Sequence, residues 1–118
     1  MVSYWKIPFY KSFATNQQRI HLIQADSHAA STLYVIKRIL NGNKLDFLFI
    51  DGDHSYEGVK KDFEMYGKLV GKGGTIAFHD ICLHGVDRLW NEIKPAYRHE
   101  EMVKDWKQRG FGIGIVYV

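Results

Sequence analysis

Residues 45–63 have the sequence LDFLFIDGDHSYEGVKKDF, in which an apolar run changes abruptly into a polar cluster. The run from Phe47 to Ile50 has no polar residue, which is typical of a strand buried on both faces of a parallel sheet. The segment DGDH, residues 51–54, follows it directly. Carboxylates and an imidazole at the end of a buried strand are costly to bury without partners, so this stretch predicts a functional site.

Short apolar runs alternate with helical periods along the rest of the chain. The predicted strands are RIHLIQA (19–25), DFLFI (46–50), TIAFHD (75–80) and GFGIGIVYV (110–118). The predicted helices are one capped by Ser27 that ends before Gly42, one from Val59 to Val70 stopped by a turn at 71–74, one from Val86 to Ile93 ended by Pro95, and a short piece at 100–106. This alternation predicts a single α/β domain over residues 1–118, with a Rossmann-like, mainly parallel sheet and flanking helices.

The composition is that of a globular protein, with 118 residues of which 46% are hydrophobic and 25% are charged. No apolar run is long enough to cross a bilayer and the N-terminus lacks a signal-peptide pattern, so we expect a cytoplasmic chain without a membrane partner. The single cysteine, Cys82, excludes an internal disulfide and leaves carboxylates and imidazoles as metal ligands. A net charge of +3 from scattered basic residues indicates no nucleic-acid partner.

Polar residues follow three of the predicted strands. Asp26 and Ser27 follow the first, Asp51 the second, and the third ends in His79 and Asp80. Ligands of open α/β sheets bind outside the carboxyl ends of the strands, so we expect these side chains to converge. Together, Asp51, His79 and Asp80 form an oxygen and nitrogen set that suits Mg²⁺, Mn²⁺ or a similar ion.

Structural explanations remain open for the same residues. Asp51 and Asp80 could cap the following helices, with His79 packed under a loop. His54 could face the crevice and accept a substrate proton, or it could be an ordinary loop residue. Asp26 could accept a hydrogen bond from a ligand amino group or cap its helix.

Five segments together resemble the S-adenosylmethionine-dependent O-methyltransferases of the class I fold. They are QRIHLIQADSH (18–28), LDFLFIDGDHSYEGVKKDF (45–63), GGTIAFHDI (73–81), GVDRLWNEIK (85–94) and GFGIGIVYV (110–118). The resemblance is strongest to the group that contains the cephalosporin-hydroxylase-like proteins and the macrolide-sugar O-methyltransferases. Its most specific elements are the DGDHSY segment and the HD pair.

The resemblance implies a Mg²⁺ site formed by Asp51, His79 and Asp80, and a catalytic base at His54. It implies an acceptor that is a hydroxyl group of a small molecule or sugar, and a loop-orienting role for Asp53. The implied binding residues for S-adenosylmethionine are Asp26, Ser27, Ile50, Asp51 and Gly52. His79 stands where the family carries a carboxylate, which would favour a softer ion.

The sequence lacks the strand and Gly-rich turn with which class I methyltransferases hold the methionine part of the donor. We therefore expect S-adenosylmethionine to bind weakly or undetectably, and the chain could be inactive. A non-catalytic oligomerising or binding module of the same fold, or a metal-dependent hydrolase, is the alternative.

The same absence predicts unpaired strand edges at residues 19–25 and 46–50. These strands could pair directly with each other or with a second copy of the chain. We expect a homodimer whose apolar interface includes the aromatic residues of the N-terminal segment. These residues are Tyr4, Trp5, Phe9, Tyr10 and Phe13.

Overall fold

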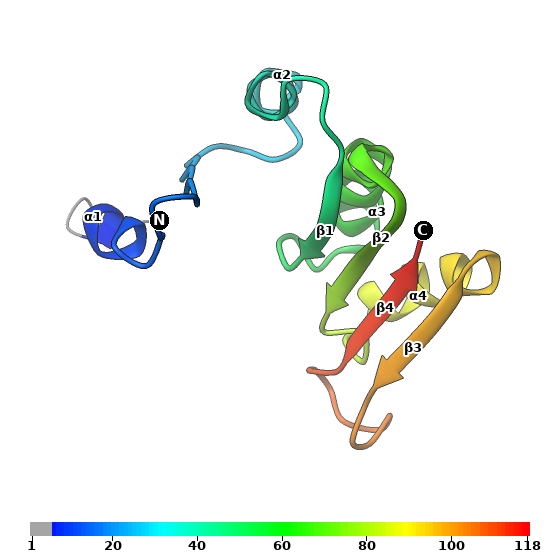
Figure 1. The fold of residues 1–118 in the computed structure, drawn as a ribbon. Coiled ribbons are helices and arrows are strands. Elements are labelled where there is room, and N and C mark those ends of the chain that lie inside the picture. The colour runs from blue at the N-terminus through cyan, green and yellow to red at the C-terminus, as the bar shows by residue number, and fades with distance from the viewer. Residues whose placement is uncertain (1–5) are drawn as a thin grey trace.

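A four-stranded sheet with two helices against one face forms the body of the molecule (Figure 1). The computed structural model describes residues 6–118. The strands are β1 (Leu45–Ile50), β2 (Val70–His79), β3 (Arg98–Met102) and β4 (Ile113–Tyr117). The helices are α1 (Lys6–Lys11), α2 (Ala30–Leu40), α3 (Tyr56–Tyr66) and α4 (Val86–Ile93), with 3₁₀ turns at Gly67–Leu69 and Lys94–Ala96. The predicted α/β class with flanking helices is confirmed.

The sheet has the strand order β1-β2-β4-β3 and is mixed. β1 pairs with β2 in parallel, with Ile50 opposite Phe78, whereas β4 runs antiparallel to both β2 and β3. The sheet is therefore less parallel than expected, because the chain turns back after β3 and enters between β2 and β3 in the opposite direction. Because β1 and β2 are parallel neighbours, they end side by side at the same edge of the sheet, where the candidate site lies.

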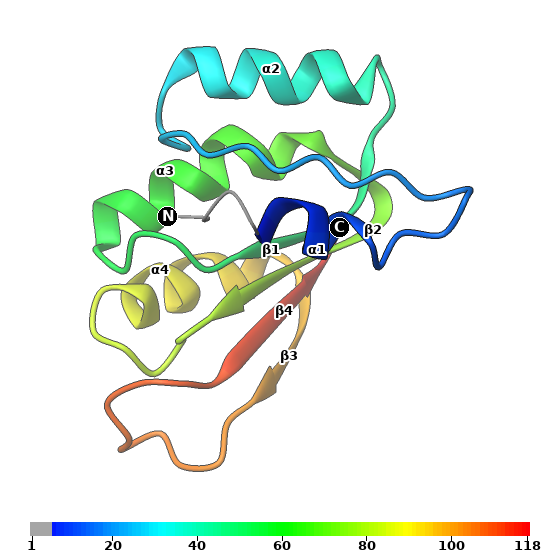
Figure 2. The same cartoon turned by 90° about the vertical axis from the view of Figure 1, so that its left-hand side faces the viewer.

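The core lies between the sheet and the helices α3 and α4, which occupy the same side of it (Figure 2). Trp90 of α4 is its largest fully buried side chain, with no exposed surface. Its ring packs against Phe78 of β2 at a centroid distance of 5.8 Å. A Cβ atom on Gly114 of β4 would lie only 2.7 Å from the indole, so the glycine makes room for Trp90.

The predicted first strand, residues 19–25, is not present as a strand. The segment has no regular secondary structure, and the strand that neighbours β1 in the described residues is β2. Because a strand needs a hydrogen-bonded partner, an apolar alternation without one stays an irregular extended chain. Ser27 is not the cap of the next helix, since α2 is preceded by Ala29 at its N-cap.

Two further assignments from the sequence are wrong. Residues 71–74 belong to β2 rather than to a turn that stops a helix, because α3 already ends at Tyr66 and the strand begins at Val70. The predicted helical piece at 100–106 is absent: its first residues belong to β3, and residues 103–106 form neither a helix nor a strand. Pairing with β4 supplies backbone hydrogen bonds along the whole strand, whereas an isolated helix of this length is unstable in water.

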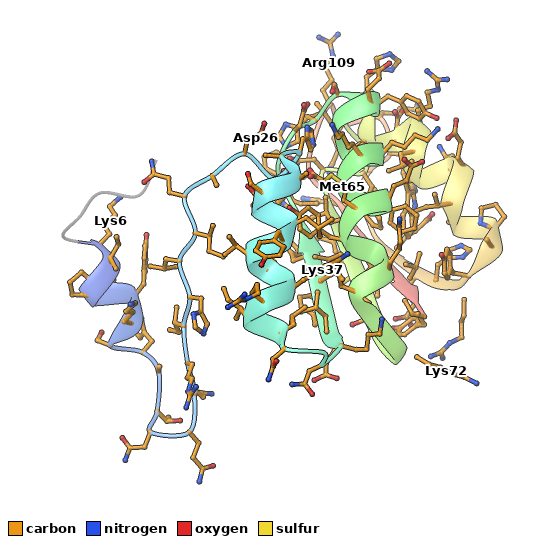
Figure 3. All side chains as sticks on the ribbon, turned by 90° about the horizontal axis from the view of Figure 1, so that it is seen from above. Lys6, Asp26, Lys37, Met65, Lys72 and Arg109 are labelled. Carbon is orange, nitrogen blue, oxygen red and sulfur yellow. The ribbon has the colours of Figure 1, made fainter. Side chains whose placement is uncertain are left out.

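The helix α1 stands apart from the body of the molecule (Figures 1 and 3). Its aromatic side chains and the one that follows are exposed, with exposed fractions of 53% for Phe9, 38% for Tyr10 and 66% for Phe13. Tyr4 and Trp5 lie outside the described residues. The homodimer therefore stays a prediction. No helix within residues 6–118 has the length and apolar character needed to cross a membrane.

Glu101 of β3 fastens α4 to the edge of the sheet. Its carboxylate accepts hydrogen bonds from Trp90 Nε1 at 2.9 Å and Lys94 Nζ at 2.8 Å. Burial raises the pKa of Glu101, but the hydrogen bonds from Lys94 and Trp90 together outweigh it and hold the pKa below its usual value. A carboxyl group with a lowered pKa stabilises the fold above its unfolded pKa and loses this effect as the pH falls through the folded one.

We therefore expect Glu101→Gln to lower the thermal midpoint by about 3 °C at pH 7. The difference from the wild type should disappear as the pH falls through the lowered pKa of the folded-state carboxyl, where the wild-type carboxylate takes up its proton. Thermal unfolding across this pH range, with the exposed Glu64→Gln as the matched control, measures it. A difference that persists unchanged at low pH would contradict the role of the charge.

Candidate functional site

The parallel ends of β1 and β2 bring the predicted metal ligands together. Ile50 lies opposite Phe78 in the register, so the residues that follow each strand become neighbours. His79 Nδ1 lies 3.4 Å from Asp51 Oδ1 and 3.0 Å from Asp80 Oδ2. The three side chains therefore converge as the sequence predicts.

The carboxylate of Asp80 is held by the loop before β4. Asp80 adopts a left-handed backbone conformation, with φ of 61°, which is uncommon for a residue with a side chain. Its Oδ1 accepts a hydrogen bond from Phe111 N at 2.8 Å, and its backbone N donates to Gly112 O at 2.9 Å. These bonds leave Oδ2 directed at the two nearby histidines, His54 and His79.

Neither Asp51 nor Asp80 is a helix cap. The N-cap of α3 is Ser55, whose Oγ accepts a hydrogen bond from Gly58 N at 3.1 Å. The N-cap of α4 is Gly85. The capping explanation of the two carboxylates is therefore excluded, and they remain available to a ligand.

His54 lies on the open side of the same cluster. Its Nε2 is 3.2 Å from Asp80 Oδ2 and 3.6 Å from Asp51 Oδ1, and 45% of its side chain is exposed. The backbone of His54 passes close to Gly85, where a Cβ atom would lie 2.6 Å from the His54 carbonyl oxygen. Gly85 also has a φ of 106°, so this close approach requires glycine.

Asp53 organises the loop beside the cluster. Its Oδ1 accepts a hydrogen bond from Ser55 N at 2.8 Å, and hydrogen bonds from the Ser55 backbone and side chain lower the pKa of Asp53. A Cβ atom on Gly58 would lie 2.1 Å from Asp53 Cγ, so the glycine gives the carboxylate its place against α3. These contacts agree with the loop-orienting role expected for Asp53.

One buried nitrogen supports the fit of a cation. His79 Nδ1 is buried and has no hydrogen-bond partner among the described residues, because its short approaches to the carboxylates lack hydrogen-bond alignment. A buried polar atom without a partner usually marks a missing water or ion. The oxygen and nitrogen donors here suit a divalent cation. Two overlapping sets are available, since single ligand atoms of Asp51, His54 and Asp80 also lie within 4.8 Å of one another.

A cleft of about 290 Å³ lies beside the cluster. Its lining residues are Ser27, Leu48, Phe49, Ile50, Asp51, Gly52, Asp62 and Tyr66. Four of the five predicted donor-binding residues therefore share one cavity, and Asp51 belongs to both the cleft and the cluster. Asp26 does not line it. Asp26 lies at the turn before α2 (Figure 3), where its Oδ1 accepts a hydrogen bond from His28 N at 2.9 Å.

Two polar residues of the cleft, Asp62 and Tyr66 on α3, were not predicted from the sequence. Asp62 Oδ1 accepts a hydrogen bond from Ser27 Oγ at 2.7 Å, and Tyr66 donates its hydroxyl hydrogen to Ser27 O at 2.6 Å. Burial raises the pKa of Tyr66, with the charges of Asp62 and Asp26 adding to it, so the phenol remains a donor. The sequence carries one signal for Asp62: it is a carboxylate next to the apolar Phe63, on the inward side of an amphipathic helix.

Comparison with known proteins adds two findings. A family model described as a methyltransferase domain matches residues 4–81, which contain every predicted site residue from Asp26 to Asp80. The uncharacterized protein R132 of Acanthamoeba polyphaga mimivirus is 38% identical over 85 residues, which cover 71% of this chain and 36% of that protein. The chain thus spans about a third of the length of this relative.

Proposed function

Because the chain belongs to the methyltransferase domain family, we propose that it serves the transfer of a methyl group from S-adenosylmethionine to a hydroxyl group of a small molecule or sugar, with a divalent metal ion. The observation that carries this proposal is the convergence of Asp51, Asp80 and two imidazoles beside the cleft formed by the predicted donor-binding residues. The DGDHSY and HD segments support the narrower assignment to the cephalosporin-hydroxylase-like and macrolide-sugar group.

The cleft would hold the donor. Ser27 offers a hydroxyl, the turn from Ile50 to Gly52 offers backbone groups, and Tyr66 and Leu48 contribute apolar surface. S-adenosylmethionine, when bound, supplies the methyl group. The side chains of Phe49 and Asp51 remain almost half exposed beside the cleft, so the donor would have few enclosing contacts. We therefore propose a weak donor site, with a dissociation constant of about 1 mM.

The carboxylates of Asp51 and Asp80 would hold the metal ion together with His79. A divalent ion, when bound, lowers the cost of negative charge on the acceptor oxygen. The protein itself orients the ligand set, since the loop at Phe111 and Gly112 locks Asp80.

His54 is the proposed base. In the tautomer that carries its hydrogen on Nε2, this hydrogen faces the carboxylates of Asp51 and Asp80. Nδ1 is then the nitrogen that can accept the proton of the acceptor hydroxyl. The exposure of the ring allows a substrate to reach it, and the close contact with Gly85 keeps the backbone of the base in place.

Titration of the wild-type chain tests the proposal. Calorimetry with Mn²⁺ and Mg²⁺ is expected to give one saturable site that a chelator reverses. NMR titration with S-adenosylhomocysteine is expected to shift the amide signals of residues 50–52 at millimolar concentrations. Binding of the metal without any response to S-adenosylhomocysteine would contradict the methyl-donor function, and binding of neither would remove the whole proposal. A donor affinity of about 1 μM or tighter would contradict the weak site.

A further inference from the structure

Asp62 is a buried carboxylate with one oxygen committed and the other directed at the cleft. Only 6% of the residue is exposed. Oδ1 accepts the hydroxyl hydrogen of Ser27 and lies 3.1 Å from His28 Nε2. Oδ2 lies 3.4 Å from the position that a Cβ atom on Gly52 would take, and both residues line the cleft. Oδ2 accepts no hydrogen bond within residues 6–118 and is not fully buried, so it remains accessible to a ligand in the cleft.

The turn before α2 owes its position to three residues of α3 spaced four apart. Gly58 O lies 3.1 Å from His28 Nε2, Asp62 bonds the Ser27 hydroxyl, and Tyr66 bonds the Ser27 carbonyl. This polar face of α3 holds Ser27 as a wall of the cleft. Asp62 is the charged member of the three.

The described residues offer donors to Oδ1 and none to Oδ2. A carboxylate oxygen that faces a cleft accepts hydrogen bonds more strongly than a neutral group does. Nucleosides carry such donors in their exocyclic amine and ribose hydroxyls. Asp26, the acid expected to meet the ligand, instead uses Oδ1 within its own turn.

We propose that Asp62 determines the specificity of this cleft: Oδ1 positions Ser27, and Oδ2 accepts a hydrogen bond from an amine or hydroxyl of the bound nucleoside. This rests on the proposed function, because it takes the cleft as the donor site. It assigns to a residue of α3 the polar contact with the ligand that the sequence predicts for Asp26.

NMR titrations with four nucleosides test this role in the wild type, Asp62→Asn and the control Glu64→Gln. The probes are adenosine, purine riboside without the amine, 2′-deoxyadenosine and 3′-deoxyadenosine. We expect Asp62→Asn to lower the affinity for adenosine by about tenfold. One probe lacks the donor that contacts Oδ2. The wild type should bind this probe more weakly than adenosine, and Asp62→Asn should change the affinity for it less than twofold. Glu64→Gln removes a charge from the same helix at an exposed position and should leave all four affinities within twofold.

Equal weakening of all four probes by Asp62→Asn, or no weakening, would overturn the contact and leave Asp62 a structural residue. If the wild type responds to S-adenosylhomocysteine but to no nucleoside, this role fails while the proposed function stands. If it responds to neither, the proposed function fails as well, so the two failures are distinguishable. Should Asp62→Asn not fold, Gly52→Ala replaces it. The added methyl group would meet Oδ2 at an ordinary contact distance and should cause the same selective loss.

Discussion

Replacement of Asp51 by alanine is expected to lower the affinity for Mn²⁺ by at least about 100-fold. Asp51 Oδ1, like Asp80 Oδ2, lies near both histidines, 3.4 Å from His79 Nδ1 and 3.6 Å from His54 Nε2. Its loss therefore removes a ligand from either set. Substitutions that only disturb the orientation of a ligand already cost 10- to about 100-fold in metal affinity, so the loss of a ligand should cost at least as much. Calorimetry with Mn²⁺ measures the change.

The control for this experiment is Asp46→Ala, which removes an exposed carboxylate from the same strand, β1. We expect it to leave metal affinity within twofold of the wild type. An Asp51→Ala protein that keeps its affinity while remaining folded would show that the metal does not bind at this cluster.

The two histidines distinguish the overlapping ligand sets. The resemblance of the sequence to metal-dependent methyltransferases assigns the third ligand to His79, in which case His54→Ala should leave metal binding nearly intact and His79→Ala should impair it. The geometry also groups His54 with the two carboxylates, because single ligand atoms of the three residues lie within 4.8 Å of one another. A loss in His54→Ala as large as that in Asp51→Ala would make His54 a ligand and would contradict its role as the base.

Replacement of Trp90 by alanine is expected to destabilise the fold by about 3–5 kcal/mol, a large share of the stability of a small domain. The indole is fully buried, packs against Phe78 and occupies the space left by Gly114. Its Nε1 also bonds Glu101, so truncation leaves a cavity and removes one hydrogen bond of that carboxylate. Urea unfolding monitored by circular dichroism measures the loss.

Trp106→Ala is the matched control. Trp106 is 47% exposed, and Lys94 Nζ lies 5.8 Å from its ring centroid. We expect the free energy of unfolding to change by about 0.5 kcal/mol or less. Comparable losses in the two variants would contradict the assignment of the core to the space between the sheet and α4.

The sequence alone predicted the elements whose signals are local. The continuous apolar run became β1, the terminal run became β4, and Pro95 follows the end of α4 as expected. The polar residues after β1 and β2 could be predicted to converge because parallel neighbours end at the same edge of a sheet.

The elements that depend on a partner could not be predicted in this way. Residues 19–25 have an apolar pattern but no neighbouring strand, whereas Arg98–Met102 have a weak pattern and form β3 because β4 lies beside them. The reversal of the chain after β3, which makes the sheet mixed, is likewise a matter of tertiary pairing.

Tertiary packing also decides which residues line the cleft. Ser27 and Asp62 are 35 residues apart in the sequence, and their hydrogen bond exists because α3 packs beside the turn before α2. Local sequence determines which residues can form a strand, a helix or a polar turn. The tertiary structure decides which of them meet, because hydrogen bonding and burial depend on neighbours that the local pattern does not specify.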